Sequence, residues 1–501
     1  MQDVTRATRC LARLTQLTGA SLLVELWPVV LRIARLIHGF RSHEVTPQRT
    51  FDFEVQLNEL LRETGRLIVQ WVFNRLEPAE EVPSLLWHQG DLYRRKRKSS
   101  MRYLSCSFGP IRLRRYLYEP IEIRDRCLFP LEWQLGVIAD SATMALADTV
   151  ARLASDFTQR QLLDHLAQRH SIHWGVRRLR KVVTAMAEGM GEQRHRAQVA
   201  RLLAWFKEAA ESTGPRKFIL SVGRDGIMLP IVQSQKYKEG AAATVSVFKR
   251  NGKRLGTVYL GQMPEEYQVA ISQQLTRLLL DILKQWNGPL PQLVYVTDAG
   301  YHPTDYFNRV LSRMCHPRTG QMLQWEWIVD YYHACQYITK IAQTILGPGR
   351  EGYAWAKKMR SWLKTKPQGL FRVLRSAGAL RAIRGLMNPE DEKDYESAYN
   401  YLRNRAAFMN YVGFRKQKLP IGSGVTEAAC KTIFTQRFKR SGMKWKLEGG
   451  ATILALRVID LSGVWQQARA AMFAAMEAAY KKDLQRPTPA YSSNEYGENA
   501  A

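Results

Sequence analysis

Three carboxylates stand out because two of them follow predicted strands and the third lies in the first turn of a predicted helix. Asp225 comes shortly after the apolar residues 218–222, and Asp298 comes shortly after residues 293–296. Glu427 lies in the first turn of a predicted helix that opens at residues 421–424. Two acids at strand ends and a glutamate from a helix can hold two Mg²⁺ ions, about 3.5–4 Å apart, that activate a nucleophile and stabilise a leaving oxygen. The three residues therefore predict phosphoryl transfer with Mg²⁺, for which Mn²⁺ could substitute.

Each acid also has a purely structural interpretation. Asp225 precedes a glycine and Asp298 precedes Ala-Gly, and both positions suit a tight turn. Glu427 would be favoured by the helix dipole, with Lys431 four residues later as an ordinary ion-pair partner. The order of the surrounding elements favours the catalytic interpretation.

Those elements must bring the three acids together. Apolar alternation and turn residues predict three strands, a helix, a strand, a helix and a strand between residues 217 and 333. The predicted strands are 218–222, 244–249, 255–260, 293–296 and 325–329, and the helices are 265–286 and 304–313, with a hairpin turn at Asn251-Gly252. Helical character continues over about 80 residues, from 334 to 418, before the Glu427 segment.

The charge of the chain points to a polyanionic partner. Its 501 residues contain 74 Lys and Arg against 45 Asp and Glu, a formal net charge of +29. Such a surplus attracts nucleic acid, although a basic protein that merely stays in solution is the simpler alternative. The most apolar stretch, residues 20–31, contains Glu25 and Pro28 and falls short of the roughly 20 apolar residues that cross a bilayer. We expect a cytoplasmic protein that binds DNA and no membrane.

Two basic segments are candidate DNA contacts. Residues 158–187 resemble helix, turn, helix, and the second helix carries Arg177, Arg178, Arg180 and Lys181, which could read a major groove or could be an ordinary basic surface. The run Arg94, Arg95, Lys96, Arg97 and Lys98 is a further phosphate contact or a solvated loop. The six cysteines are scattered without a Cys-x-x-Cys pair, so we expect reduced, mostly buried thiols and no zinc.

Several motifs together resemble a known family. They are Gly223-Arg-Asp225-Gly226, Val296-Thr-Asp298-Ala-Gly300, Asp330-Tyr-Tyr-His333-Ala334, Gly422-Ser-Gly-Val-Thr-Glu427-Ala-Ala-Cys-Lys431 and Arg437-Phe-Lys-Arg-Ser-Gly-Met-Lys-Trp445. The chain, from about residue 55 to 470, resembles the Kra group of bacterial insertion-sequence transposases, which have an RNase H-like DDE core. The resemblance implies that Asp225, Asp298 and Glu427 are the catalytic, metal-binding acids. It also implies that the helical block before Glu427 is an insertion in the core, and that Lys431, Arg437, Lys439 and Arg440 face DNA phosphates.

Two features depart from the family or need separate weighing. Members often carry a Cys-x-x-Cys ribbon before a Phe-Pro-Leu-(Asp/Glu) motif, but here only Cys127 remains, so a zinc site is doubtful. Asp330 and His333 resemble an Asp-x-x-His pair that supports the active site in several relatives. Asp330 could also ligate metal directly, or both residues could simply end a strand and begin a helix.

The predicted fold is α/β, an RNase H-like mixed sheet flanked by helices, interrupted by an all-helical insertion and preceded by mainly helical DNA-binding regions. The expected divisions are a helical extension (1–45), a helical and small-strand domain (46–140), a helix-turn-helix-like DNA-binding region (141–195), the first part of the core (205–335), the insertion (336–420), the last part of the core (421–480) and a disordered tail (481–501).

The expected function is a DNA transposase that binds double-stranded DNA at its element's terminal inverted repeats, cleaves a strand and joins it to target DNA as a homodimer or higher oligomer. The alternatives are an RNase H-like nuclease or resolvase without strand transfer, and a catalytically inactive transposase-derived DNA-binding regulator. Intact Asp225, Asp298 and Glu427 argue against the inactive regulator.

Overall fold

The computed structural model describes residues 20–78, 82–122, 127–232, 234 and 236–485. It contains two compact units, Met1–Met190 with Arg469–Ala501 and Gly191–Ala468. Residues 1–19 of the expected extension and residues 486–501 of the expected disordered tail lie outside the described residues, while residues 481–483 belong to a helix.

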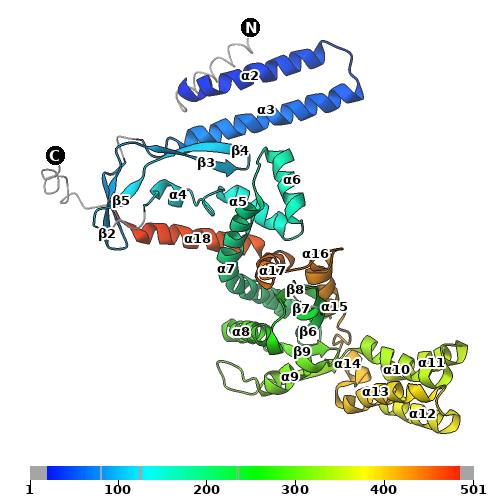
Figure 1. Ribbon diagram of the computed structural model, residues 1–501. Coiled ribbons are helices and arrows are strands. Elements are labelled where there is room, and N and C mark those ends of the chain that lie inside the picture. Colours follow the sequence, from blue (N-terminus) through cyan, green and yellow to red (C-terminus); the bar gives the residue numbers. More distant parts are fainter. Residues whose placement is uncertain (1–19, 79–81, 123–126, 233, 235, 486–501) are drawn as a thin grey trace. The chain divides into compact units, whose positions relative to one another are not determined.

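The first unit combines a helical hairpin with small antiparallel sheets and short helices (Figure 1). The second helix of the hairpin begins with Thr46 as N-cap and Pro47 in its first turn. Arg32 of the first helix forms an ion pair with Glu63 of the second at 2.7 Å. One sheet has the order β11-β1-β2-β5, and β3 pairs with β4. The elements are α2 (Ala20–Arg41), α3 (Pro47–Phe73), β1 (Leu85–His88), β2 (Asp91–Arg95), β3 (Ser100–Cys106), β4 (Gly109–Arg115), β5 (Tyr118–Pro120), α4 (Pro130–Gln134), α5 (Met144–Ala154) and β11 (Leu484–Gln485).

The expected helix, turn and helix are present, but the second helix is much longer than predicted. Helix α6 (Gln159–His170) opens with a capping box between Thr158 and Gln161 and ends at Ser171, which has a left-handed backbone. Helix α7 (Val176–Glu211) then runs for 36 residues, whereas the sequence analysis ended it near Met186. Gly189 and Gly191 lower the helix propensity just after the predicted end, but no proline interrupts the stretch and the helix continues through both. Helices α7 and α18 (Trp465–Asp483) each contribute residues to both units.

The second unit is built around a mixed five-stranded sheet with the order β10-β9-β6-β7-β8 (Figure 1). The long central strand β6 pairs in parallel with β9 and antiparallel with β7. Strand β8 is antiparallel to β7, and β10 is parallel to β9. The strands are β6 (Ile219–Leu229), β7 (Lys238–Phe248), β8 (Arg254–Gln262), β9 (Gln292–Thr297) and β10 (Trp325–Val329). The predicted succession of strands and helices along the chain and the turn at Asn251-Gly252, with Gly252 at φ +89°, are confirmed.

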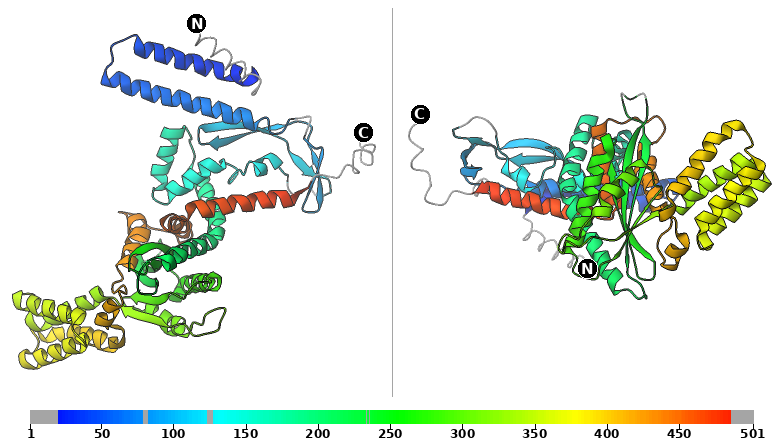
Figure 2. Two further views of the ribbon diagram at one scale, coloured as in Figure 1. Left: turned by 180° about the vertical axis from the view of Figure 1, so that it is seen from behind. Right: turned by 90° about the horizontal axis from the view of Figure 1, so that it is seen from below.

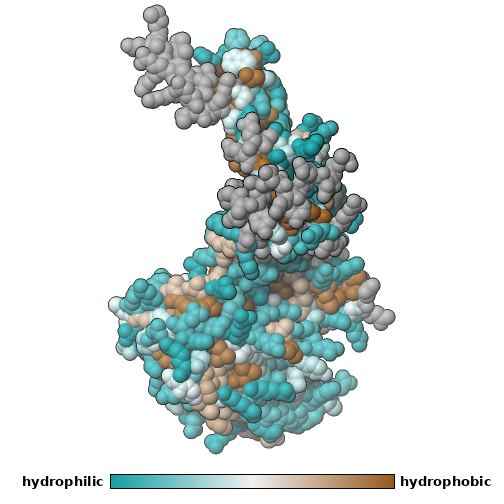
Figure 3. All heavy atoms as spheres, turned by 90° about the vertical axis from the view of Figure 1, so that its left-hand side faces the viewer, coloured by the Kyte–Doolittle hydropathy of each residue, from teal (hydrophilic) through white to brown (hydrophobic). Residues whose placement is uncertain are grey.

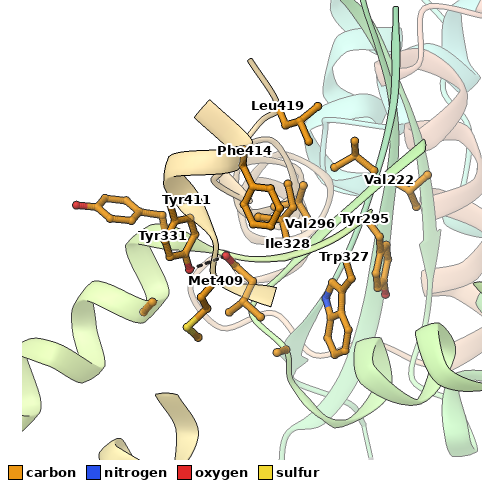
Figure 4. Packing of buried hydrophobic residues seen from close by; sticks show 14 of the residues in the cluster. Val222, Tyr295, Val296, Trp327, Ile328, Tyr331, Met409, Tyr411, Phe414 and Leu419 are labelled. Carbon is orange, nitrogen blue, oxygen red and sulfur yellow. Dashed lines mark hydrogen bonds between the residues drawn. The ribbon is translucent and has the colours of Figure 1, made fainter. Parts of the chain in front are cut away.

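Helices cover both faces of this sheet. Helix α8 (Val269–Gln285) buries Ile271, Leu275, Leu278, Leu279, Ile282 and Leu283 in the large core, which also receives side chains from α9 (Tyr301–Arg309). Figure 4 shows part of this core, where Tyr411 donates a hydrogen bond of 2.9 Å to the Val329 carbonyl at the end of β10. A second cluster, formed by residues such as Ala242, Phe434 and Leu454, seals the other face.

The insertion follows β10 directly and forms a packet of helices beside the sheet (Figures 1 and 2). It comprises α10 (Tyr331–Leu346), α11 (Arg350–Thr365), α12 (Gly369–Arg384), α13 (Glu392–Asn404) and α14 (Tyr411–Lys416). The chain then returns to the sheet through α15 (Gly424–Ala429), a π-helical segment (Cys430–Thr435), α16 (Gln436–Phe438) and α17 (Leu447–Leu461). The predicted helical insertion and the helix bearing Glu427 are thus confirmed as elements.

The surface seen in Figure 3 is mostly hydrophilic with scattered hydrophobic residues. Among the described helices, none has both the length and the apolar composition needed to cross a bilayer.

Candidate active site

The strand register places three aspartates in one row. The parallel pairing of β6 with β9 runs to Gly223 opposite Val296, and that of β9 with β10 runs to Thr297 opposite Val329. Continuing both registers brings Asp225, Asp298 and Asp330 to equivalent positions where the parallel strands separate. Asp225 was expected just past the end of its strand, but it lies within β6, because β6 continues along β7 to Leu229.

Alternation along β6 decides which face the acid occupies. Arg224 is almost fully buried and donates to Ser272 Oγ at 2.9 Å and Gln268 Oε1 at 3.0 Å, so it points toward α8. Asp225 therefore points to the opposite face, which α15 covers. The Asp298 and Glu427 carboxylates both act electrostatically on Asp225, and α15, which bears Glu427, packs against β6 and β7 on this face.

The surroundings of Asp225 disfavour its negative charge. Burial raises its pKa from 3.8 to about 6, and the charges of Asp298 and Glu427 add to that rise. The Gly226 amide, which donates to Oδ1 at 2.7 Å, and the Cys430 thiol lower it only in part. Burial and the same three acids also raise the pKa of Cys430, so this thiol stays protonated and donates to Asp225.

We therefore expect Asp225→Asn to stabilise the protein in the absence of divalent cations. Because the folded-state pKa is raised, ionisation of Asp225 costs stability as pH rises from about 4 through 6. The free energy of unfolding of the variant should exceed that of the wild type by about 1–3 kcal/mol at pH 8, and the difference should vanish near pH 4. Urea unfolding at both pH values measures it. An equal stability difference at pH 4 and pH 8 would contradict the raised pKa.

The Asp298 turn is held in a strained conformation by the insertion. Ala299 is 1% exposed and has a left-handed backbone with φ +58°, a conformation that costs about 1–3 kcal/mol for such a residue. Tyr401 of α13 donates to the Asp298 carbonyl at 2.5 Å, and Arg405 donates to the Ala299 carbonyl at 3.0 Å. The Gly300 amide donates to Asp298 Oδ1 at 2.9 Å, which orients the carboxylate.

Helix α15 approaches the sheet closely enough to bring Glu427 beside the aspartates. Thr426 Oγ1 and Thr244 Oγ1 of β7 are hydrogen-bonded at 2.8 Å. A Cβ on Gly223 would lie 2.0 Å from Thr426 Oγ1, so glycine is required there. The Glu427 side chain is exposed and accepts from Ser423 Oγ at 3.1 Å. In the described part of the chain no ion pair joins Glu427 to Lys431, contrary to the structural alternative.

Asp330 is fully buried, and both of its oxygens are occupied. Oδ1 accepts from the amides of Tyr332 and His333 at 2.5 and 3.2 Å and caps α10. Oδ2 accepts from the Ser423 amide at 2.6 Å and from the Ser423 hydroxyl. Since Ser423 also contacts Glu427, Asp330 fixes the loop from which the catalytic-candidate glutamate emerges.

His333 supports the other side of the site through aromatic packing. Its ring lies edge-on to Tyr337 and Tyr401, with centroids 5.3 and 5.7 Å away, and Tyr337 stacks on Tyr401 at 3.8 Å. Tyr401 in turn binds the Asp298 carbonyl. Asp330 follows β10 and caps α10, as the purely structural interpretation has it, and the Asp330 and His333 pair also contacts the neighbours of Glu427 and Asp298.

The chemistry of the three acids fits a divalent cation. They supply hard carboxylate oxygens, and the mutual repulsion that raises the pKa of Asp225 would be relieved by positive charge. As placed, no three His, Cys, Asp or Glu side chains among the described residues are grouped closely enough to hold an ion. Ligation would require the exposed Glu427 side chain to rotate toward the two aspartates.

The basic residues after Glu427 do not all reach solvent. Lys431, Lys439 and Arg440 are exposed, as a phosphate contact requires. Arg437 is only 3% exposed, and its guanidinium lies over the Trp445 ring at 4.9 Å. The expectation that Arg437 faces DNA is wrong, because the turn after α16 folds back and covers it.

A basic cleft lies between two loops that the sequence analysis did not connect. Strand-like hydrogen bonds of 2.9 and 3.0 Å join Trp445 to Val232 and Pro230. Cavities of about 360 and 780 Å³ open along these loops. The exposed cations that line them are Lys236, Lys238, Lys439, Arg440, Lys444 and Lys446. The loops follow β6 and the Glu427 segment, so the cleft belongs to the same end of the sheet as the three acids.

The DNA-binding candidates of the first unit are largely exposed. Arg177, Arg178, Arg180 and Lys181 all reach solvent in the first turns of α7. Arg94 and Arg95 lie on β2, where Arg95 packs over Tyr116, and the neighbouring Lys96 pairs with Glu119 at 2.7 Å. Arg97 and Lys98 are exposed in the loop that follows. Cys127 is exposed and unbridged, and residues 123–126 before it lie outside the described residues.

Four residues of the site escaped sequence reasoning: Tyr401, Arg405, Ser423 and Cys430. Ser423 and Cys430 stand inside the motif around Glu427, but Tyr401 and Arg405 carry no local signal, because only the folded insertion brings them to Asp298. A scan against protein-family models found no match to this chain, and a search of curated proteins found none either.

Proposed function

We propose that the protein is a DDE transposase with an RNase H-like core, which cleaves the ends of its insertion sequence and joins them to target DNA. The central strand β6 has β7 and β8 on one side and the parallel strands β9 and β10 on the other, which is the strand order expected of that core. The proposal is supported by the equivalent positions of Asp225 and Asp298 on adjacent parallel strands and by the packing of the helix that bears Glu427 against the same sheet.

In this mechanism the three carboxylates would hold two Mg²⁺ ions, which would lower the pKa of water and stabilise the leaving 3′-oxygen. The Asp298 turn, fixed by Tyr401 and Arg405, keeps one carboxylate in place, and the Cys430 thiol orients Asp225. Water attacks the phosphorus at the element end, and the bond to the 3′-oxygen breaks to leave a 3′-hydroxyl and a 5′-phosphate. That 3′-hydroxyl then attacks a target phosphodiester and displaces its 3′-oxygen.

The cations around the acids favour DNA as the substrate. The basic cleft, together with Lys431, offers seven exposed positive side chains at the same end of the sheet. Each such side chain on a phosphate would add affinity through counterion release. Zinc is not part of the proposal, since the site supplies carboxylate oxygens and Cys430 is occupied with Asp225.

The test is a strand-transfer assay with the DNA that flanks the gene. Labelled duplexes carrying candidate inverted repeats are incubated with the full chain, a target plasmid and Mg²⁺. A transposase nicks at the repeat end and joins the 3′-end to the plasmid. Cleavage without joining would identify the nuclease or resolvase instead, and binding with neither reaction would identify the inactive regulator.

The exposed start of α7 should read sequence if it lies in a major groove. Replacing Arg177, Arg178 and Lys181 with glutamine should weaken binding to element ends by about 1–3 kcal/mol per lost base contact and leave random DNA less affected. Competition binding on both duplexes measures the difference. An equal loss on both would make this helix a phosphate contact only.

A further inference from the structure

The helical insertion carries an unusual share of the positive charge. Residues 331–420 contain 17 Lys and Arg against six Asp and Glu. From Arg350 to Arg384, across α11 and α12, there are ten Lys and Arg and one acid, Glu351. The sequence alone assigns this insertion no function.

Four of the six acids of the insertion form ion pairs within it. Glu351 pairs with Arg384 at 3.0 Å, and Glu396 pairs with Arg381 at 2.7 Å. Glu392 also pairs with Arg381, and Asp394 pairs with Lys340 at 2.9 Å. These contacts join α11 to the end of α12, and they join the end of α12 and the middle of α10 to α13. They stabilise the insertion and leave the rest of α11 and α12 without compensating charge.

Six of the remaining cations are exposed: Arg350, Lys357, Lys358, Lys366, Arg372 and Arg375. None of them makes an ion pair with any residue that the structure describes. The inner sides of the same helices are apolar, with Ala356, Met359 and Leu363 on α11 and Val373 and Leu374 on α12. Lys358 Nζ lies over the Trp362 ring at 5.0 Å and Arg372 donates to the Pro367 carbonyl at 3.1 Å, but no acid in the described part of the chain neutralises any of the six charges.

The insertion is also tied to the active end of the sheet. Helix α10 starts at Asp330, and α13 supplies Tyr401 and Arg405 to the Asp298 turn. We propose that α11 and α12 form a second DNA-binding surface that contacts the phosphate backbone of duplex DNA without reading its sequence. This inference rests on the proposed function and adds to it, because the DNA would then contact both the basic cleft and the insertion.

A duplex fits this surface better than a compact anion. Five of the six exposed cations lie on the two neighbouring helices α11 and α12, and Lys366 lies between these helices, so the charge is spread along a surface. Lysine and arginine side chains that reach out singly from helices suit the regularly spaced phosphates of a duplex, and they specify no base.

The experiment compares two variants of the full chain with equal loss of charge. The first changes Lys357, Lys358, Arg372 and Arg375 to glutamine. The control changes Lys207, Lys253, Arg254 and Lys284, which are exposed at the opposite end of the sheet, near the β7–β8 turn and the ends of α7 and α8. Binding to a labelled duplex of random sequence is measured by fluorescence anisotropy over a series of salt concentrations.

We expect the insertion variant to bind roughly tenfold or more weakly near 0.1 M salt, with the slope of log K against log salt reduced by about 2–4. The control should bind like the wild type, and a duplex with an element end should show the same loss as random DNA. Wild-type binding by the insertion variant, or an equal loss in the control, would overturn the inference. A wild-type protein that binds no duplex would instead overturn the proposed function.

Discussion

Asp298→Asn should lower strand cleavage and strand transfer by several orders of magnitude and leave DNA binding intact. The substitution keeps the shape of the side chain, and its Oδ1 can still accept from the Gly300 amide. It removes the negative charge that would help to hold a divalent cation beside Asp225. Binding should persist or strengthen, because a negative charge near the phosphates is gone.

The measurement pairs a cleavage time course with anisotropy binding on the same labelled duplex. Tyr401→Phe is the matched variant, because it removes only the hydroxyl that binds the Asp298 carbonyl. It should reduce the rate far less than Asp298→Asn, since the carboxylate itself remains. If Asp298→Asn cleaved and joined at near wild-type rates, Asp298 would be a turn residue and the inactive-regulator alternative would regain support.

The succession of strands and helices along the core could be predicted because each strand has a strong local signal. Residues 325–329 are predicted and observed as a strand, and strand β9 extends the predicted 293–296 by one residue at each end. The ends of β6 and β7 could not be predicted, because their antiparallel pairing extends past the apolar residues into Asp225 and Lys238. Hydrogen bonding with a neighbour, rather than hydrophobicity, keeps those residues extended.

The candidate acids could be named from the sequence, but the residues that hold them in place could not. Asp225, Asp298 and Glu427 stand in recognisable motifs, and the register of β6 and β9 explains why the two aspartates meet. Tyr401 and Arg405 are more than 100 positions beyond the turn they hold, so only the packing of α13 makes them part of the site. The prediction for Arg437 was wrong for a different reason: the residue stands in a basic motif, but the fold buries it against the Trp445 ring.

Asp330→Ala should destabilise the second unit by about 3–5 kcal/mol, because it leaves buried donors unpaired. The carboxylate has no exposed surface and accepts from the amides of Tyr332, His333 and Ser423 and from the Ser423 hydroxyl. Ser423→Ala removes only the hydroxyl and should cost about 1 kcal/mol. Urea unfolding of the full chain measures both variants, and Asp330→Asn, which keeps one acceptor oxygen for α10, should fall between them.

Unfolding of the Asp330 and Asp298 variants with and without Mg²⁺ also shows whether Asp330 supports the site or ligates the metal. A cation bound only to the folded state raises its stability, so Mg²⁺ should raise the unfolding midpoint of the wild type. Asp298→Asn should lose that rise, whereas Asp330→Asn should keep it, because both oxygens of Asp330 are already occupied by Ser423 and the first turn of α10. A variant at Asp330 that unfolds like the wild type but no longer responds to Mg²⁺ would make Asp330 a ligand. In that case the hydrogen bonds to Ser423 would have to break when the ion binds, and the loop before Glu427 would move with them.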